Sequence, residues 1–404
     1  MLKGVKLKLK LKPDQIQFFA QNAGACRFIY NQALAAKIDY YNATGDSLSY
    51  NTIAGMVPNI KKLPEFAWLK QCESTCLQQS LRNLDQAFQN FFNSLNGSRK
   101  GKSIGFPKFK KKGVTKDSFT ITNTNHTIQA KSGYLKIPKL GLVKVWSGAK
   151  RFKLINGLIK RVTFSKDSDN NWYASLLVDT SAFNSNPEVK YKSTGETDGL
   201  DLGVKTSATF KNTSFNLPER IKILEMKIKK LNKQLHRKVL GSKNREKARA
   251  KLSKCYYTLK QIRLDFMHKL SHLVATHVDI LTVETLDIQA MMKNRKLARS
   301  IGRQGWYMLL TFLKYKLEDS NKVFIQVNKQ FPSSKLCSTC GDINASMDLS
   351  IRNWVCPSCN SNHDRDQNAA RNLDNVSRWF KSTGEIVTSK HNYIKSIIPN
   401  LATL

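Results

Sequence analysis

Four cysteines in the last third of the chain are spaced to bind a metal ion. Cys337 and Cys340 form one pair, Cys356 and Cys359 form a second, and fifteen residues lie between the pairs. Two cysteines separated by two residues can share one tetrahedral ion, and a second such pair completes a four-thiolate shell of the kind that closes structural zinc sites. The repeated spacing therefore predicts one structural Zn²⁺ ion.

Three carboxylates that are far apart in the sequence occupy similar predicted contexts. Asp201 lies in a predicted strand, Glu284 at the C-terminal end of another, and Asp366 near the start of a helix. In an open α/β sheet, such positions can converge at one edge. Clustered carboxylates repel one another unless cations lie between them, and phosphodiester hydrolysis uses two Mg²⁺ ions about 4 Å apart. The three residues therefore predict a catalytic site with Mg²⁺, in which two ions are expected.

Each carboxylate also has a simpler interpretation. Asp201 can cap a turn, Glu284 can form a surface ion pair, and either Asp364 or Asp366 can cap the helix that begins near Asn368. The charge balance and the neighbouring cysteine pairs favour the catalytic interpretation when the three acids are taken together.

The charge of the chain indicates a polyanionic partner. Its 404 residues include 67 Lys and Arg against 29 Asp and Glu, which gives a formal charge of +38. Nucleic acid is the expected partner, with an anionic membrane surface as the weaker alternative. Binding that neutralises many phosphates releases counterions, so the affinity should fall steeply with salt.

The hydrophobic pattern divides the chain into regions of different character. Residues 3–11 alternate Lys with Val and Leu, as a half-buried strand does, helices are expected from about 14 to 96, and short β-rich runs follow from 118 to 180. These runs predict a small β-barrel.

The second half of the chain reads as an α/β sheet with a long helical hairpin. Its predicted elements are a strand at 200–204, a basic hairpin at 218–272, a strand at 280–283, a helix around 306–317 and a strand at 323–327.

The loop from Gly97 to Gly113 mixes basic and aromatic side chains, which suits a phosphate backbone with a base to stack on. The alternative is a solvated hinge whose Phe106 and Phe109 enter a core. The candidate nucleic-acid contacts of this loop are Phe106, Lys108, Lys110, Lys111 and Lys112.

Other features predict less. No apolar stretch approaches the roughly 18 to 20 residues that span a bilayer, and the start does not resemble a secretion signal, so we expect an intracellular, cytoplasmic protein. Four histidines, none with a second ligand at metal-binding spacing, are expected in the core or in solvent: His268, His272, His277 and His363. Residues from about 376 to 404 show little periodicity and are expected to be partly disordered.

Four motifs in order carry a resemblance to a known family: residues 199–205 (GLDLGVK), 283–286 (VETL), 333–341 (SSKLCSTCG) and 363–372 (HDRDQNAARN). They resemble the successive motifs of TnpB, the insertion-sequence-encoded RNA-guided nuclease family related to type V CRISPR effectors. The resemblance covers residues 199–372 firmly and the N-terminal half in layout.

The resemblance implies an RNase H-like RuvC nuclease domain at 196–332 and 363–380, with Asp201, Glu284 and Asp366 as metal ligands. Asp366 is preferred over Asp364 because the family's catalytic Asp stands two residues before an Asn, as Asp366 does before Asn368. Thr285, which departs from the usual pattern, removes no metal ligand.

The resemblance also implies a division into further parts. These are a wedge-type β-barrel at 1–12 and 107–195, an inserted helical recognition domain at 13–106, a zinc-binding target-nucleic-acid-binding module at 333–362 and a C-terminal tail at 381–404.

The implied function is an RNA-guided DNA endonuclease encoded by a transposable element. Its implied partners are a guide RNA from the transposon end and target DNA with a short flanking motif, and the protein is expected to act as a monomer with RNA. Gln78, Gln79 and Arg82 fall where the family's recognition helix approaches the flanking DNA, and Gln can read adenine edges in the major groove. Two alternatives remain: an RNA-guided DNA-binding regulator that does not cut, and a transposase that transfers DNA strands.

Overall fold

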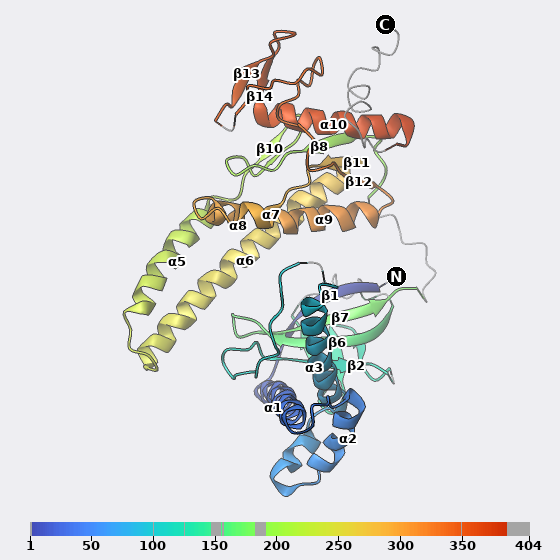
Figure 1. The fold of residues 1–404 in the computed structure, drawn as a ribbon, viewed down its shortest axis with the longest axis vertical. Helices are drawn as coiled ribbons and strands as arrows, with labels where there is room; N and C mark the ends of the chain where they lie inside the picture. The colour runs from blue at the N-terminus through green and yellow to red at the C-terminus, as the bar shows by residue number, and fades with distance from the viewer. Residues whose placement is uncertain are drawn as a thin grey trace. The chain divides into compact units, whose positions relative to one another are not determined.

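In the computed structural model the chain divides into two compact units, residues 1–185 and residues 186–404, each described by itself (Figure 1). The structure describes residues 2–99, 101–124, 126–146, 155, 157–181, 191–348 and 350–385. Parts of the predicted barrel region (147–154 and 182–190) and most of the predicted tail (386–404) lie largely or wholly outside the described residues.

The first unit contains a seven-stranded antiparallel sheet in the order β2-β6-β7-β1-β5-β4-β3. Its strands are β1 (Leu2–Lys10), β2 (Ser118–Thr122), β3 (Gln129–Lys131), β4 (Tyr134–Ile137), β5 (Gly141–Val145), β6 (Leu158–Lys166) and β7 (Trp172–Asp179). In β1 the apolar residues Val5, Leu7 and Leu9 are buried, so the strand expected from the Lys/apolar alternation is confirmed. Among the described residues the outer strands β2 and β3 are not paired with each other, and closure into a barrel stays a prediction.

Helices accompany this sheet and share its core. They are α1 (Pro13–Thr44), α2 (Tyr50–Ile60), the 3₁₀ helix η1 (Pro64–Gln71) and α3 (Ser74–Leu95), as the sequence predicts for this region. Phe19 of α1 is fully buried, and its ring meets those of Phe119, Phe164 and Trp172 edge-on at 5.4, 5.0 and 5.2 Å between centroids. These aromatic contacts fix α1 against the sheet.

The second unit is built on a three-stranded parallel sheet in the order β12-β11-β8. Its strands are β8 (Thr197–Leu200), β11 (Ile280–Val283) and β12 (Val323–Gln326). A short hairpin, β9 (Ala208–Thr209) and β10 (Ser214–Phe215), continues it through an antiparallel bridge between Asp201 and Thr209.

The strand predicted at 200–204 is wrong in its bounds, because β8 ends at Leu200. The chain then turns tightly: a Cβ on Gly203 would lie 2.7 Å from the carbonyl oxygen of Thr206. Asp201 therefore follows the strand rather than lying within it.

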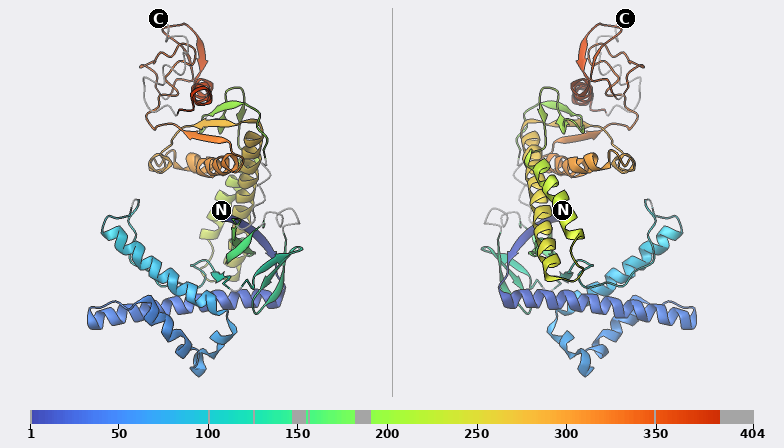
Figure 2. Two further views of the ribbon diagram at one scale, coloured as in Figure 1. Left: turned by 90° about the vertical axis from the view of Figure 1, so that its right-hand side faces the viewer. Right: turned by 90° about the vertical axis from the view of Figure 1, so that its left-hand side faces the viewer.

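Further helices and a short two-stranded hairpin complete the second unit. They are α5 (Arg220–His236), α6 (Lys243–His277), α7 (Ile288–Met291), α8 (Ala298–Gln304), α9 (Trp306–Glu318), the strands β13 (Asn353–Val355) and β14 (Asn362–Asp364), and α10 (Arg365–Thr383). Figure 2 shows α5 and α6 lying side by side as the predicted hairpin. The predicted tail is wrong for residues 376–383, which belong to α10; this helix ends at a left-handed Gly384.

Helix α10 lies directly against β8. A Cβ on Gly199 would lie 2.1 Å from the carbonyl oxygen of Ala370 and 2.4 Å from the amide nitrogen of Asp374. Only glycine permits this approach of helix and strand. No helix in the described part of the chain is both long and apolar enough to cross a membrane.

We predict that Gly199→Ala lowers the free energy of unfolding by about 1–3 kcal/mol, because the added methyl group forces α10 away from β8. The measurement is urea or thermal unfolding. Gly302→Ala in α8 is the matched control, since its Cβ would meet only Met292 Cε at 3.6 Å, and it should be neutral or slightly stabilising. Equal stabilities of the Gly199 variant and the native chain would contradict the packing described here.

Candidate active site and metal centre

Two neighbouring parallel strands deliver the first two candidate acids to one edge of the sheet. Leu200, the last residue of β8, pairs in register with Val283, the last residue of β11. Asp201 and Glu284 are the next residues of the two strands, so both leave the sheet at its C-terminal edge, where α/β folds place their ligand sites.

The third acid comes from α10. Asp366 lies one helical turn before Ala370, the residue that touches Gly199, and so shares its face of the helix. Farther along α10, Ser377 hydrogen-bonds Thr282 of β11 at 2.7 Å between hydroxyl oxygens. These contacts hold α10 across both strands and carry Asp366 toward the same edge.

The carboxylates of Glu284 and Asp366 act on Asp201. Burial raises the pKa of Asp201 well above its usual range, and these two carboxylates raise it further. Burial also raises the pKa of Glu284, against the opposing effects of the Ser333 hydroxyl and the Arg365 guanidinium. Asp201 therefore lies within electrostatic reach of the other two acids that the sequence singled out, and their role as a common site stays a prediction.

Each of the two later acids has a polar partner that the sequence did not predict. The Ser333 hydroxyl donates to Glu284 Oε1. Arg352 Nη1 donates to Asp366 Oδ1 at 3.0 Å. Asp364 takes the capping role, because its Oδ1 accepts a hydrogen bond from the backbone N–H of Gln367 at 2.9 Å.

A cavity of about 310 Å³ opens beside Glu284. Thr285, Asp287 and Lys329 contribute polar groups to its lining, and Lys329 Nζ lies 3.1 Å from Asp287 Oδ2. A phosphate could approach Glu284 through this opening, with a lysine at its rim.

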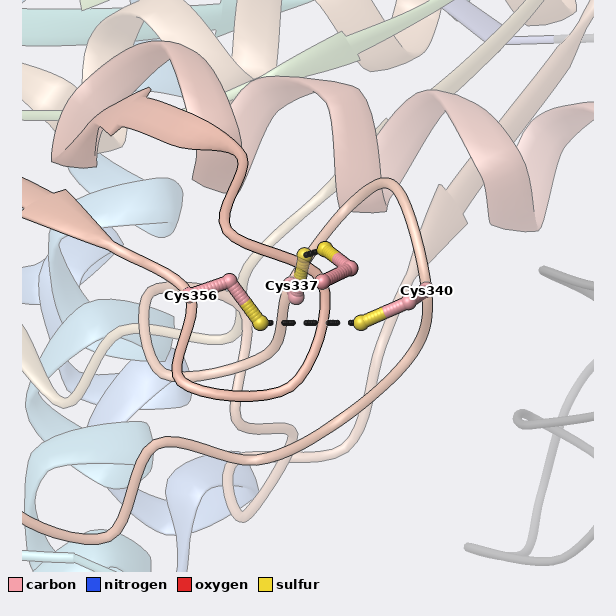
Figure 3. Close-up of side chains that lie close together, drawn as sticks. Cys337, Cys340 and Cys356 are labelled. Carbon is pink, nitrogen blue, oxygen red and sulfur yellow. Dashed lines mark hydrogen bonds between the residues drawn. The ribbon is translucent and has the colours of Figure 1, made fainter.

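The four cysteines meet as their spacing predicts. Their sulfur atoms all lie within 4.8 Å of one another, with 3.7 Å between Cys337 and Cys359 and 3.6 Å between Cys340 and Cys356. In Figure 3 the sulfur atoms of Cys340 and Cys356 point toward each other beside Cys337. Thiolates at about 2.3 Å from a tetrahedral zinc ion lie about 3.8 Å apart, so the cluster fits Zn²⁺.

Neighbouring donors lower the pKa of two of the four cysteines, Cys337 and Cys359, whereas burial raises that of Cys340 to about 12. Ser361 Oγ lies 3.0 Å from the Cys359 sulfur, and this hydroxyl together with the Ser361 backbone N–H lowers the pKa of Cys359 to about 6. Burial alone would raise the pKa of Cys337, but hydrogen bonds from Ser361 and from backbone N–H groups lower it overall.

In the described part of the chain, this is the one cluster of three or more Cys, His, Asp or Glu side chains gathered closely enough to hold an ion. The three carboxylates are less closely gathered, and two of them have partners of their own, Ser333 for Glu284 and Arg352 for Asp366.

The histidines have structural partners, with one addition that the sequence missed. His268 stacks on Phe312, and the Tyr191 hydroxyl meets His272 Nδ1 at 2.9 Å. His277 Nδ1 lies 2.9 Å from the Leu273 carbonyl oxygen. His363 is buried with Nε2 3.1 Å from the Cys337 sulfur, so it adjoins the metal cluster. Its place four residues after Cys359 is the signal that could have found it.

The predicted contacts on α3 line a second cavity, of about 640 Å³, within the first unit. Gln79 and Arg82 lie there with Lys160 and Arg161 of β6, while Gln78 is exposed one position earlier. The Arg82 Nε also donates to the Tyr50 hydroxyl at 3.3 Å, which orients the guanidinium.

The basic loop combines both interpretations that its sequence left open. Phe106 meets Phe88 and Phe91 edge-on at 5.4 and 5.5 Å, and Lys110 Nζ lies 3.7 Å over the ring of Tyr30. Phe106 is still 45% exposed and Phe109 50% exposed, and Lys108, Lys111 and Lys112 are exposed beside them. Binding of nucleic acid by these residues stays a prediction.

Three parts of the chain match known family models. Residues 306–373 match the family described as "Cas12f1-like, TNB domain", residues 181–295 the family described as "Probable transposase", and residues 1–46 the family described as "Helix-turn-helix domain". In this structure residues 13–44 form one continuous helix, α1, rather than two helices joined by a turn.

Curated relatives match over nearly their full length. A "Putative RNA-guided DNA endonuclease" of Streptomyces pristinaespiralis is 30% identical over 92% of this chain and 90% of that protein. The "Putative RNA-guided DNA endonuclease InsQ" of Escherichia coli (strain K12) is 29% identical over 96% and 95%.

Among solved structures, the Cas12f1 chain of a Cas12f1-sgRNA-target DNA complex matches with a TM-score of 0.50 at 16% identity, over 90% of this chain and 83% of that one. The chain shares the overall fold of that Cas12f1 chain, and its four-cysteine module lies within the segment that matches the Cas12f1-like TNB domain. On the strength of its curated relatives, the chain belongs to the TnpB family of RNA-guided DNA endonucleases.

We predict that the purified protein carries about one zinc ion per chain and that Cys337→Ser releases it, with loss of structure in residues 333–362, because ion binding supplies much of the folding energy of such modules. Elemental analysis and limited proteolysis measure the two effects. Cys255→Ser, a buried cysteine of the helical hairpin outside the cluster, should keep the zinc. Zinc-free native protein would refute the assignment.

Proposed function

We propose that this protein is an RNA-guided DNA endonuclease that cleaves target DNA beside a short flanking motif, with Asp201, Glu284 and Asp366 as its catalytic acids. One observation carries the catalytic part: Asp201 is held next to two further carboxylates that raise its pKa. Carboxylates at one sheet edge repel one another, and a cation bound between them relieves this repulsion.

The strand order supports an RNase H-like, RuvC-type fold for this half. Through the bridge between Asp201 and Thr209, the strands follow in the order β10-β9-β8-β11-β12, antiparallel on the first side of β8 and parallel on the second. The first acid leaves the central strand β8, the second leaves its parallel neighbour, and the third comes from the helix across them.

Asp201, Glu284 and Asp366 would hold Mg²⁺, which when bound supplies positive charge at the phosphodiester being cleaved. The surrounding residues prepare that site. Ser333 and Arg352 hold Glu284 and Asp366 in place while no cation is present. Arg365 offsets part of the negative charge at Asp201 and Glu284.

Guide RNA and target DNA are the proposed partners, as the names of the curated relatives and of the Cas12f1 complex indicate for those proteins. Base pairing to a guide would supply most of the sequence information, and the charge of +38 would bind the two backbones. Gln79 and Arg82, with Lys160 and Arg161 beside them, are proposed to read the flanking motif, because amide and guanidinium groups bond base edges while lysines hold phosphates.

We predict that Glu284→Gln and Asp366→Asn each reduce plasmid cleavage by at least about 100-fold, since even a second-shell partner of a metal ligand is worth about 10- to 100-fold. Binding of guide RNA and of target DNA should persist, because neither variant removes a lysine or arginine that could bind a phosphate. Cleavage is followed with Mg²⁺ and guide RNA, and binding is followed without added Mg²⁺.

Asp364→Ser is the matched control for Asp366→Asn. It removes a carboxylate two residues away but keeps an N-cap hydroxyl for α10, and it should cut at the native rate. Cleavage by the Asp366 variant at the native rate would reject the proposed site. Binding without cleavage in the native protein would indicate a regulator, and recovery of joined transposon ends would indicate a transposase.

A further inference from the structure

A cavity of about 600 Å³ lies on the polar side of the helical hairpin, where α5, α6 and the first turn of α8 meet. Cationic side chains line it: Lys229, Lys233, Arg237 and Arg299. Within the described ranges of the chain, its lining includes no carboxylate and none of these four cations forms an ion pair. The volume is in the range of about 300–1,000 Å³ that binds groups of nucleotide size.

The positive charge of this surface is concentrated by the helix itself. Lys229, Lys233 and Arg237 are spaced four residues apart and therefore lie on one face of α5, where like charges repel. Residues 220–270 contain seventeen Lys and Arg against three Asp and Glu. A bound polyanion would relieve this repulsion. Solubility alone does not require so many positive charges on one surface.

An aromatic ring stands among these cations. Tyr256 of α6 is 47% exposed, although it lies between the buried apolar positions Leu252 and Leu259 of the hairpin core. Its hydroxyl accepts a hydrogen bond from Asn232 Nδ2 at 3.2 Å, and the same Nδ2 donates to the Ile228 carbonyl oxygen at 3.1 Å. The ring is therefore fixed by its hydroxyl end while much of its surface stays open to the cavity.

We infer that this cavity binds an unpaired stretch of nucleic acid, with one base stacked on Tyr256 and the flanking phosphates held by Lys229, Lys233, Arg237 and Arg299. An aromatic platform inside a basic groove suits single strands, because the faces of bases within a duplex are covered by their neighbours. The strand can come from guide RNA or from separated target DNA, which share this chemistry. The inference rests on the proposed function only in requiring that nucleic acid reaches the nuclease half.

Photo-cross-linking tests the stacking directly. The full-length protein is mixed, without added divalent metal, with single-stranded oligonucleotides that carry 5-bromouracil, one of RNA and one of DNA, and the cross-linked peptide is identified by mass spectrometry. We expect a cross-link at Tyr256. Tyr256→Leu should lose it and bind about tenfold more weakly, while Tyr256→Phe keeps its ring and should bind as the native protein does. Tyr307→Leu, at a tyrosine of α9 that is 77% exposed outside the cavity, is the matched control.

A charge experiment separates the cavity from the general basicity of the hairpin. Lys229→Glu with Lys233→Glu should weaken single-strand binding more, and flatten its salt dependence more, than Lys247→Glu with Lys251→Glu. The second pair has the same four-residue spacing on an exposed part of α6 and does not line the cavity. Circular dichroism confirms that each variant is folded.

Equal losses from the two lysine pairs, or a cross-link that forms elsewhere and survives Tyr256→Leu, would overturn the inference. A stronger cross-link with the RNA probe would assign the cavity to guide RNA, and one with the DNA probe would assign it to a target strand; both support it. Because the assay contains no added divalent metal, its failure would leave the result for the Glu284 and Asp366 variants unchanged.

Discussion

The nuclease half depends on one backbone contact, that of Gly199 with α10. Because a Cβ at Gly199 would lie 2.1 Å from the carbonyl oxygen of Ala370, the helix can rest on β8 only where the strand has no side chain. Buried hydrogen bonds then fix how the helix is rotated: Thr197 donates to Asp374 at 2.7 Å, and Ser377 meets Thr282 at the same distance. With α10 so placed, its first turn, which carries Asp366, lies at the C-terminal edge of the sheet.

Gathering three carboxylates at that edge opposes folding while no cation is bound. The pKa of Asp201 and that of Glu284 are both raised, so the native state retains protons that the unfolded chain has released. The metal-free protein therefore loses stability as the pH rises from the ordinary carboxyl range toward the raised values. The Ser333 hydroxyl and the Arg365 guanidinium limit this loss, because both lower the pKa of Glu284.

The sequence predicted what periodicity and spacing determine. The Lys/apolar alternation in β1, the four-cysteine cluster and the place of Glu284 at the C-terminal end of β11 were predicted correctly, because each depends on residues close together in the chain. The partners Ser333, Arg352 and His363 were not predicted, since each depends on how a loop returns to the sheet. The end of β8 was misplaced because Leu202 and Val204 keep an apolar pattern through a turn that Gly203 makes possible.

The cysteine module and the acids are joined through α10, so neither is positioned independently. The side-chain amide of Asn372 donates to the carbonyl oxygens of Ser333 and Leu336 at 2.8 Å each, and Asn368 accepts from the backbone N–H of Ser338 at 2.9 Å. The chain that enters the module is thus tied to the helix that carries Asp366. Ser333 of this same segment bonds Glu284, and Arg352 on the far side of the module bonds Asp366. A movement of the module would therefore change the surroundings of two of the three acids, so its insertion between β12 and α10 links it mechanically to the proposed active site.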